Sequence, residues 1–453
     1  MSTMEQVEVG KYQPYPEYKD SGVEWVGDMP HHWQTKPAFA AVMDQCIKNS
    51  DGAESNVLSL SYGNIVERDV ENNFGLLPES FNTYQIVNPG DIVLRLTDLQ
   101  NDKRSLRVAR STLRGIITSA YLKLACGDEL DNRYAYRLLH SYDTTKVFYG
   151  MGGGLRQSMK FEDFRRLPFL LPPVEEQRTI AAFLDYETAR IDKLIAQQQR
   201  LIDLLKEKRQ AVISHAVTKG LNPDAPMKDS GVEWLGEVPE HWKKVTFKYL
   251  LAKTIDNRGR TPPVFDSGIP MLEAKQVDGE TLFSSDDFYK FIDLHGHANF
   301  IRDDVQENDI LFITVGTIGK TCLVPPNAEY VIVQNIVAFR CIQDEVEPSF
   351  LLFWLRSTSA KEAMISTNKD SILDSIKVSD FVQSRLFIPP TKEQKSIGQT
   401  LKLKLARMDS VSDKAQQAIQ LMQERRTALI SAAVTGKIDL RGWVAPTEEV
   451  SNG

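Results

Sequence analysis

Two long stretches of the chain carry hydrophobic residues at helical spacing. Residues 171–220 and 388–437 each begin with a Pro-Pro pair, a position that helix starts tolerate, and Gly220 and Gly436 mark their ends. Apolar residues recur at steps of three, four and seven, which predicts helices with a seam like that of a coiled coil. In the second stretch, Thr391 and Gln394 have the spacing of a capping box. The expected seam, for helix pairing or subunit docking, is Leu184, Ile191, Leu194, Leu201, Leu205 and Val212 in the first helix and Leu401, Met408, Val411, Met422 and Leu429 in the second.

Helices of this length cannot bury their apolar stripes on a small domain. About forty helical residues span roughly 60 Å, at about 1.5 Å per residue. Pairing of the two helices with each other is the simplest way to bury both stripes, and we expect an antiparallel pair because a domain lies between them in the sequence. The alternative is that each helix packs only on its own domain.

The chain also repeats itself. Residues 19–33 read KDSGVEWVGDMPHHW and residues 228–242 read KDSGVEWLGEVPEHW, with eleven of fifteen positions identical. The two helical stretches repeat as well, since one begins LPPVEEQ and the other IPPTKEQ. Fixed ends around variable middles predict one architecture with two different recognition surfaces. A plain duplication without functional difference remains the alternative.

Between these repeats the pattern is that of mixed α/β domains. Runs rich in β-branched residues predict strands at residues 92–96, 115–118, 310–313 and 330–333, and residues 134–141 and 350–357 have helical patterns. The expected fold class is α/β, with two similar mixed α/β domains, two long helices forming an antiparallel coiled-coil-like spacer, and an internal pseudo-twofold repeat. The expected boundaries are 1–170 for the first domain, 171–220 for the first helix, 221–387 for the second domain, 388–437 for the second helix and 438–453 for a C-terminal tail.

The composition is that of a folded globular protein. Hydrophobic residues make up 42% and charged residues 25% of the 453 residues, which is typical of globular protein and excludes wholesale disorder. The N-terminus has no signal-peptide pattern and no apolar run approaches a membrane span, so we expect a cytoplasmic protein without membrane contact. The four cysteines form no C-x-x-C pair, and we expect buried free thiols and no metal site. The net charge is −7, so any DNA binding requires locally concentrated positive charge or charge supplied by partners.

Local positive charge occurs in residues 98–114, which read DLQNDKRSLRVARSTLR. Arginine and lysine at this density suit phosphates and guanine edges, whereas glutamine and asparagine suit adenine. A glycine-rich run at residues 149–157 and several loops of the second domain are further candidates, and solvated or inert loops are the alternative for each. The predicted DNA contacts are Arg95, Gln100, Asn101, Lys103, Arg104, Arg107, Arg110, Arg114, Gly153, Arg156, Gln157, Asn257, Arg258, Arg260, Lys275, Gln276, Lys320 and Lys369, and we expect Arg104 and Arg107 to be exposed.

Catalytic motifs are absent from the sequence. No Pro-Pro pair is preceded by Asn or Asp, as an amino-methyltransferase motif requires, and no Gly-x-Ser-x-Gly elbow or dinucleotide fingerprint occurs. The segment around Lys320 lacks the first glycine of a P-loop, because Thr314 stands there. We therefore expect no catalytic residues in this chain.

The chain resembles the specificity subunits of type I restriction-modification systems over nearly its whole length. The resemblance rests on the order domain, helix, domain, helix and on the repeated KDSGVEW and PP-x-x-EQ elements. The resemblance implies two target recognition domains, each reading one half of a bipartite site in double-stranded DNA. It also implies that the helices set the half-site spacing and dock two modification (methyltransferase) subunits, which restriction subunits (translocase and nuclease) then join. S-adenosylmethionine, ATP and Mg would be bound by those partners, and none by this chain. The assembled complex would methylate adenine and cleave DNA with ATP, while this chain would be non-catalytic.

Two other functions remain open from the sequence. A coiled-coil scaffold that reads no DNA sequence would explain the helices but not the basic segments. A reader in a methylation-only or other phage-defence assembly would use the same architecture. Binding that shows no preference among DNA sequences would favour the scaffold.

Overall fold

The computed structural model describes residues 12–70, 80–99, 106–151, 158–259, 261–277, 288, 290–367 and 375–446. The chain divides into two compact units. Unit 1 comprises Met1–Gln198 and Gln417–Gly453, and unit 2 comprises Gln199–Gln416. Each unit therefore contains one mixed α/β module, part of the first long helix and part of the second.

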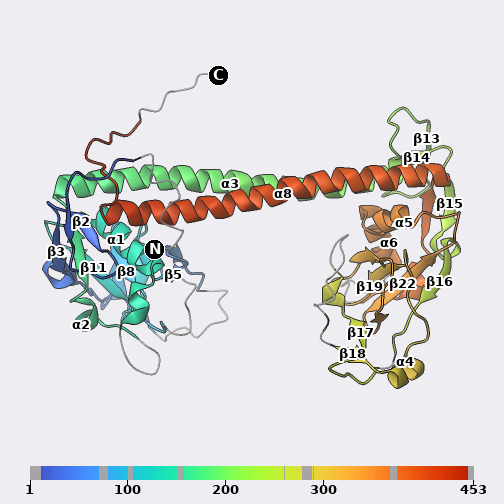
Figure 1. The fold of residues 1–453 in the computed structure, drawn as a ribbon, viewed down its shortest axis with the longest axis horizontal. Helices are drawn as coiled ribbons and strands as arrows, with labels where there is room; N and C mark the ends of the chain where they lie inside the picture. The colour runs from blue at the N-terminus through green and yellow to red at the C-terminus, as the bar shows by residue number, and fades with distance from the viewer. Residues whose placement is uncertain are drawn as a thin grey trace. The chain divides into compact units, whose positions relative to one another are not determined.

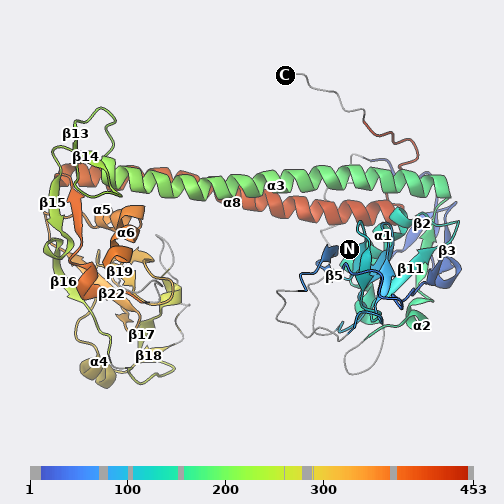
Figure 2. The same ribbon diagram turned by 180° about the vertical axis from the view of Figure 1, so that it is seen from behind.

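The long helices are α3 (Val174–Lys219) and α8 (Thr391–Val434), of 46 and 44 residues. In each unit they lie side by side (Figures 1 and 2). In unit 1, buried residues 180–184 of α3 share a core with residues 430–434 of α8, and Asp192 forms an ion pair with Arg426 at 3.0 Å. In unit 2, Arg209 pairs with Asp409, and the core joins residues 213–217 to residues 397–405. The two helices are thus antiparallel within each unit.

The seam between the helices differs in part from the expectation. Leu184, Ile191 and Leu401 are buried and Leu205, Val212, Met408, Met422 and Leu429 are half-buried. Leu194, Leu201 and Val411, however, are 41%, 37% and 43% exposed, while Ile202 is buried, so of the two expected roles subunit docking is the one left to these three residues as a prediction. The reason for their exposure is that 3.6 residues per turn do not match a seven-residue repeat, so a straight helix turns a heptad stripe by about 20° per repeat.

Unit 1 is built around a four-stranded antiparallel sheet in the order β4-β11-β8-β9. Its strands are β4 (Val42–Asp44), β8 (Ile92–Leu94), β9 (Val108–Arg110) and β11 (Leu122–Cys126). The described residues of unit 1 also form four strand pairs and two α-helices beside this sheet. The pairs are β1 (Tyr18–Asp20) with β2 (Asp28–Pro30), β3 (Gln34–Pro37) with β12 (Pro168–Leu171), β5 (Leu58–Ser61) with β6 (Asn64–Glu67) and β7 (Gln85–Val87) with β10 (Gly115–Ile117), and the helices are α1 (Asn132–Thr144) and α2 (Phe161–Phe164). The side chain of Asp131 caps α1 by accepting from the backbone N–H groups of Arg133 and Tyr134.

Unit 2 has a four-stranded sheet with the equivalent order, β16-β22-β19-β20. Its strands are β16 (Leu251–Ile255), β19 (Ile310–Ile313), β20 (Thr321–Leu323) and β22 (Ile336–Cys341). The other elements are β13 (Met227–Asp229) with β14 (Glu237–Pro239), β15 (Lys243–Thr246) with β23 (Arg385–Ile388), a three-stranded sheet of β17 (Ile269–Leu272), β18 (Phe291–Ile292) and β21 (Val331–Ile332), and the helices α4 (Leu294–Phe300), α5 (Pro348–Leu355), α6 (Thr358–Thr367) and α7 (Val378–Phe381). The predicted strands and short helices of both modules are present in the structure.

The core of each unit joins the module to the helices. In unit 1, Trp33, Tyr134 and Phe169 are fully buried together with Leu184 and Val434. In unit 2, Trp242, Phe247 and Phe350 are buried with Leu401. Burying a large aromatic side chain contributes roughly 1.5–3 kcal/mol, so these tryptophans stabilise the attachment of module to helix.

The expectation of four buried cysteines was wrong for one of them. Cys322 is buried, and Cys126 and Cys341 are partly buried, but Cys46 is exposed beyond the end of β4. All four are free thiols, and burial raises the pKa of both Cys126 and Cys341 to about 12, which keeps them protonated.

Candidate nucleic-acid interface

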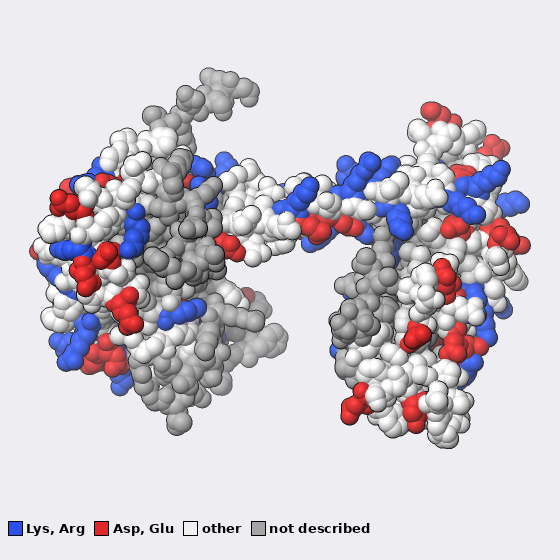
Figure 3. Space-filling model, viewed as in Figure 1, with Lys and Arg blue, Asp and Glu red and all other residues white. Residues whose placement is uncertain are grey.

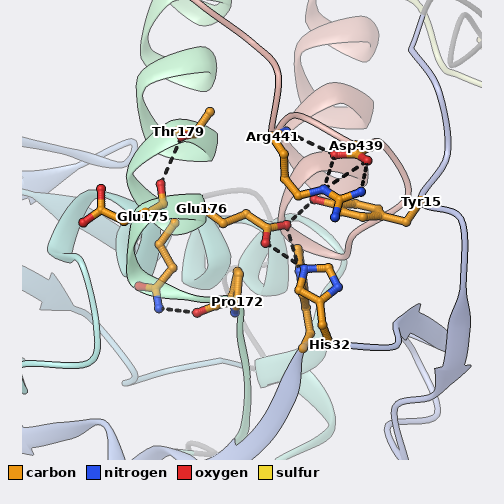
Figure 4. Close-up of polar contacts among 10 residues, drawn as sticks. Tyr15, His32, Pro172, Glu175, Glu176, Thr179, Asp439 and Arg441 are labelled. Atoms are coloured by element: carbon orange, nitrogen blue, oxygen red, sulfur yellow. Dashed lines mark hydrogen bonds and ion pairs between the residues drawn. The ribbon is translucent and has the colours of Figure 1, made fainter.

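The repeated element of unit 1 is held to the first turn of α3 by one buried carboxylate, that of Glu176 (Figure 4). Its Oε1 accepts hydrogen bonds from the Tyr15 hydroxyl at 2.5 Å and from Trp33 Nε1 at 3.0 Å, and its Oε2 lies 2.8 Å from His32 Nε2. Burial and the bond to Glu176 raise the pKa of Tyr15 well above its usual value, so the phenol stays a donor. We call this arrangement the Glu176 clamp.

Unit 2 contains the same arrangement with fewer partners. Trp242 Nε1 donates to Glu393 Oε1 at 3.3 Å, and His241 Nε2 lies 2.7 Å from Glu393 Oε2. The Glu393 side chain is 28% exposed, compared with 5% for Glu176. The chemistry of the attachment is therefore shared, but the unit 1 version is better shielded from water.

The glutamine that follows each glutamate ties the helix start to the module. Gln177 accepts from the backbone N–H of Asp131 at 2.9 Å and donates to the carbonyls of Glu129 and Pro172. Gln394 likewise accepts from the N–H of Glu347 and donates to nearby carbonyls. The predicted capping box of α8 was therefore wrong, because the Gln394 side chain is buried and engages other backbone groups.

The end of each long helix is attached to a repeated element as well. After α8, Lys437 Nζ donates to the carbonyls of Val26 and Asp28, at 3.2 and 2.9 Å. Lys219, the last residue of α3, donates through Nζ to the carbonyls of Leu235 and Glu237. Within each unit, one repeated element thus joins the start of one long helix to the end of the other.

In unit 1, Tyr15 of the Glu176 clamp is also contacted by Arg441. The guanidinium of Arg441 lies 5.1 Å from the centre of the Tyr15 ring and donates to Asp439, whose pKa it lowers (Figure 4). The backbone N–H of Asp439 in turn donates to the carbonyl of Gln13 at 2.8 Å. Asp439 and Arg441, which follow α8, therefore contact the N-terminal part of the unit 1 module.

The basic segment of unit 1 corrects one prediction. Arg107 is fully buried, and its guanidinium donates to the carbonyls of Thr97 and Asp98 at 2.9 and 3.3 Å. Its backbone N–H donates to the buried carboxylate of Asp143, whose pKa burial raises to about 6. The expectation that Arg107 is exposed was wrong, because its guanidinium binds backbone carbonyls of the residues that follow β8 and does not face solvent. It is removed from the candidate DNA contacts.

The other described arginines among the predicted contacts of unit 1 lie nearer the surface. Arg95 and Arg110 are half-buried, and Arg114 is exposed and paired with Glu54 at 3.1 Å. These three remain predicted contacts.

Of the predicted DNA contacts in unit 2, Asn257 is buried and Arg258 is half-buried. Asn257 is 3% exposed, and its amide bridges the backbone of Asp303 and Ile332, so it serves the fold and is also removed from the candidate contacts. Arg258 is half-buried, donates to Asp256 and lowers the pKa of that carboxyl, and lies in the wall of a pocket shared with Lys377.

Three further candidates of unit 2 lie at or near the surface. Gln276 is half-buried and accepts from the N–H of Glu273, while the Lys275 ammonium lies 3.5 Å from the Glu273 carboxylate. Lys275 and Lys320 are exposed. The remaining predicted contacts lie outside the described residues: Gln100, Asn101, Lys103, Arg104, Gly153, Arg156, Gln157, Arg260 and Lys369.

Positive charge is also concentrated on the helices of unit 2. Lysine and arginine side chains gather there on the face seen in Figure 3. The exposed members include Arg200, Lys206, Lys208, Lys402, Lys404 and Arg407. A chain with a net charge of −7 therefore still presents a strongly basic surface.

Sequence reasoning missed the clamp residues Glu176 and Glu393. The signal was present, because a glutamate of the PP-x-x-EQ motif and the final His-Trp of the repeated element occur in both halves of the chain. Only the structure shows that these two motifs contact each other.

Neither a metal centre nor a membrane span is found in the part of the chain that the structure describes. No three His, Cys, Asp or Glu side chains among the described residues could together hold an ion. Of the helices that are described, none combines the length and the apolar character of a membrane-crossing segment.

Comparison with known proteins points to one family. Residues 239–417 match the family model of the type I restriction modification DNA specificity domain. The EcoBI specificity subunit of Escherichia coli is 26% identical over 296 residues, which cover 62% of this chain and 60% of that subunit. The EcoKI specificity subunit of Escherichia coli K12 is 24% identical, with 65% of this chain and 63% of that subunit covered. The match thus spans less than two thirds of either relative's own length.

Solved structures share the fold. A chain from a structure of a type I restriction-modification system, described for its complex assembly and conformational transition, aligns with a TM-score of 0.67 and 14% identity, covering 90% of this chain and 98% of that one. The HsdS subunit from Thermoanaerobacter tengcongensis aligns over the same shares with a TM-score of 0.51 and 15% identity. The chain is thus similar in sequence to specificity subunits of type I restriction-modification systems, and residues 239–417 match the model of their DNA specificity domain.

Proposed function

We propose that this chain is the DNA-reading subunit of a type I restriction-modification complex and that each module reads one half of a bipartite site. The observation that carries the proposal is the repeated framework. The two modules have sheets of equivalent order, β4-β11-β8-β9 and β16-β22-β19-β20. The same Trp-His-Glu contact attaches the first module to α3 and the second to α8. The framework is constant while the loops of the two modules differ, which is what two readers of different half-sites require.

The proposed role of the helices is to set the distance between half-sites. Each helix is continuous and belongs to both units, since the division falls at Gln198 in α3 and at Gln416 in α8. A helix resists bending because its backbone hydrogen bonds are all internal. In this proposal the two modules together form a pseudo-twofold repeat, and the helices are a coiled-coil-like spacer between 1–170 and 221–387.

The catalytic chemistry is proposed to lie on partner subunits. Methyl transfer from S-adenosylmethionine and cleavage driven by ATP and Mg would be carried out by modification and restriction subunits that dock on this chain. Exposed apolar residues of the helices are suitable docking positions for two modification subunits: Leu194, Leu201, Leu204, Leu403, Val411 and Leu421. The purified chain alone should transfer no methyl group to DNA, and transfer by the chain alone would contradict this assignment.

The test is to sequence the methylated sites in cells that express this chain with its modification subunit. We expect one bipartite motif with a spacer of constant length. A four-residue insertion at Gln198, matched by one at Gln416, should lengthen both helices by roughly 6 Å. This should widen the spacer by about two base pairs and leave both half-sites unchanged. Methylation without a bipartite motif would instead favour a scaffold, and an unaltered spacer would refute the role of the helices.

A further inference from the structure

The hairpin formed by β5 and β6 ends in an unusual turn. Ser61 pairs with Asn64, so Tyr62 and Gly63 are its two turn residues, with φ values of +47° and +79°. Both values are positive, as in a type I′ turn, which is normally formed by Asn-Gly or Asp-Gly because large side chains are strained in this region. The tyrosine side chain is also 75% exposed. Neither backbone preference nor packing explains a tyrosine at this position.

The hairpin is held firmly on the module. Leu58, Leu60 and Ile65 are buried against Val93 and Ala109 of the main sheet. A side chain on Gly63 would lie 2.9 Å from Leu106 Cδ1, so the turn itself is seated against Leu106. The strained tyrosine is therefore presented by a rigid element, which is the condition under which strain at a residue indicates a function.

The hairpin also lies beside the basic segment of unit 1. Leu106 is part of that segment, at one end of its described portion. At the other end, Asn56 donates to the carbonyl of Arg114 at 2.8 Å, directly before β5. The tip itself, residues 61–66, contains no acidic residue that would repel phosphates.

We propose that Tyr62 is a specificity-determining contact to the bases of the half-site read by the unit 1 module. The major groove of DNA admits a two-stranded ribbon, and at its tip an aromatic ring can make apolar contact with base edges, above all with the methyl group of thymine. This inference rests on the proposed function, because it takes DNA to be the partner. Unlike the predicted contacts, which are mostly charged or amide side chains, Tyr62 would contribute an aromatic surface.

The decisive variant is Tyr62→Asn, because asparagine tolerates the left-handed turn that strains tyrosine. In hydrogen exchange with increasing urea, the unit 1 peptides of the variant should be at least as protected as those of the wild type. In the complex with the modification subunit, its affinity for the methylated motif, measured by fluorescence anisotropy, should fall at least tenfold. Its affinity for a duplex with that half-site scrambled should stay unchanged. Tyr62→Phe, which keeps the ring, should remain within about threefold of the wild type.

The control is Tyr249→Asn in unit 2, which removes a tyrosine that is 73% exposed. It should leave the methylated motif unaltered, whereas Tyr62→Asn should relax base identity in one half-site only. If the wild-type complex shows no bipartite motif, the proposed function fails. If the wild type shows the motif and Tyr62→Asn binds it equally well, the inference about Tyr62 is wrong. Equal weakening on cognate and scrambled duplexes, or loss of complex assembly, would also overturn it.

Discussion

The Glu176 clamp should contribute far more stability than its counterpart at Glu393. Replacing Glu176 with alanine leaves Trp33 Nε1 and the Tyr15 hydroxyl without their acceptor, and both residues are almost fully buried. An unpaired buried donor costs about 1–3 kcal/mol. Two of them, with the small cavity left behind, should lower the free energy of unfolding of unit 1 by about 3–5 kcal/mol.

The matched variant Glu393→Ala removes the same contact where water can replace it. Glu393 is 28% exposed and its bond to Trp242 is long, at 3.3 Å. We therefore expect a loss of only about 1 kcal/mol for unit 2. Glu176→Gln, which keeps one acceptor oxygen, should fall between the two alanine variants.

Because the chain has two units, a single melting temperature does not report on either one. Hydrogen exchange followed by mass spectrometry in increasing urea resolves peptides from each unit. We expect early exchange confined to unit 1 peptides in Glu176→Ala, and a smaller shift confined to unit 2 in Glu393→Ala. Equal losses, or a larger loss for Glu393→Ala, would refute the argument from burial.

Three further outcomes are expected. Arg107→Ala should destabilise unit 1 by about 2–4 kcal/mol, because it removes a buried, hydrogen-bonded guanidinium. Hydrogen exchange of unit 1 peptides in urea measures this, and unchanged exchange would contradict it. Gly436→Ala should cost about 3 kcal/mol or more, because φ is +70° and the new Cβ would lie 2.2 Å from Pro30 Cδ. Gly220→Ala should cost only about 1 kcal/mol, because φ is +79° but the nearest atom, Glu393 Oε1 at 3.2 Å, is the end of a flexible side chain. Denaturation of the two variants shows which substitution loses more stability. Burial lowers the pKa of His140 to about 4, so its neutral form contributes stability above pH 6.5 that is lost as the pH falls towards 4. The stability difference between wild type and His140→Gln should therefore shrink by about 3 kcal/mol between pH 7 and 4, and parallel pH profiles would exclude this role.

The architecture was accessible from the sequence because its signals are local or repeated. Helical periodicity over more than forty residues, together with Pro-Pro starts and glycine ends, defines α3 and α8 without knowledge of their partners. The duplication of KDSGVEW and PP-x-x-EQ shows that the same framework is used twice. Short strands such as β8 and β19 were found because β-branched runs have a period that backbone geometry dictates.

Which polar residues face solvent was not accessible in the same way. Arg107 and Asn257 are of residue types that often contact DNA, yet both are buried and form hydrogen bonds to the backbone of their own modules. A side chain's exposure depends on which distant segments pack over it, and no local pattern encodes this. The same holds for Leu194 and Leu201, since the direction each residue faces along a helix depends on the accumulated rotation of a straight helix against its neighbour.

The sequence by itself determined the repeated elements, the two long helices and the resemblance to type I specificity subunits. The tertiary structure decided how they are joined, because Glu176 meets Trp33 across 143 residues and Lys437 meets Asp28 across 409. A buried polar group is tolerated only where a partner of complementary shape and charge forms a hydrogen bond with it. That condition exists only after the chain has folded.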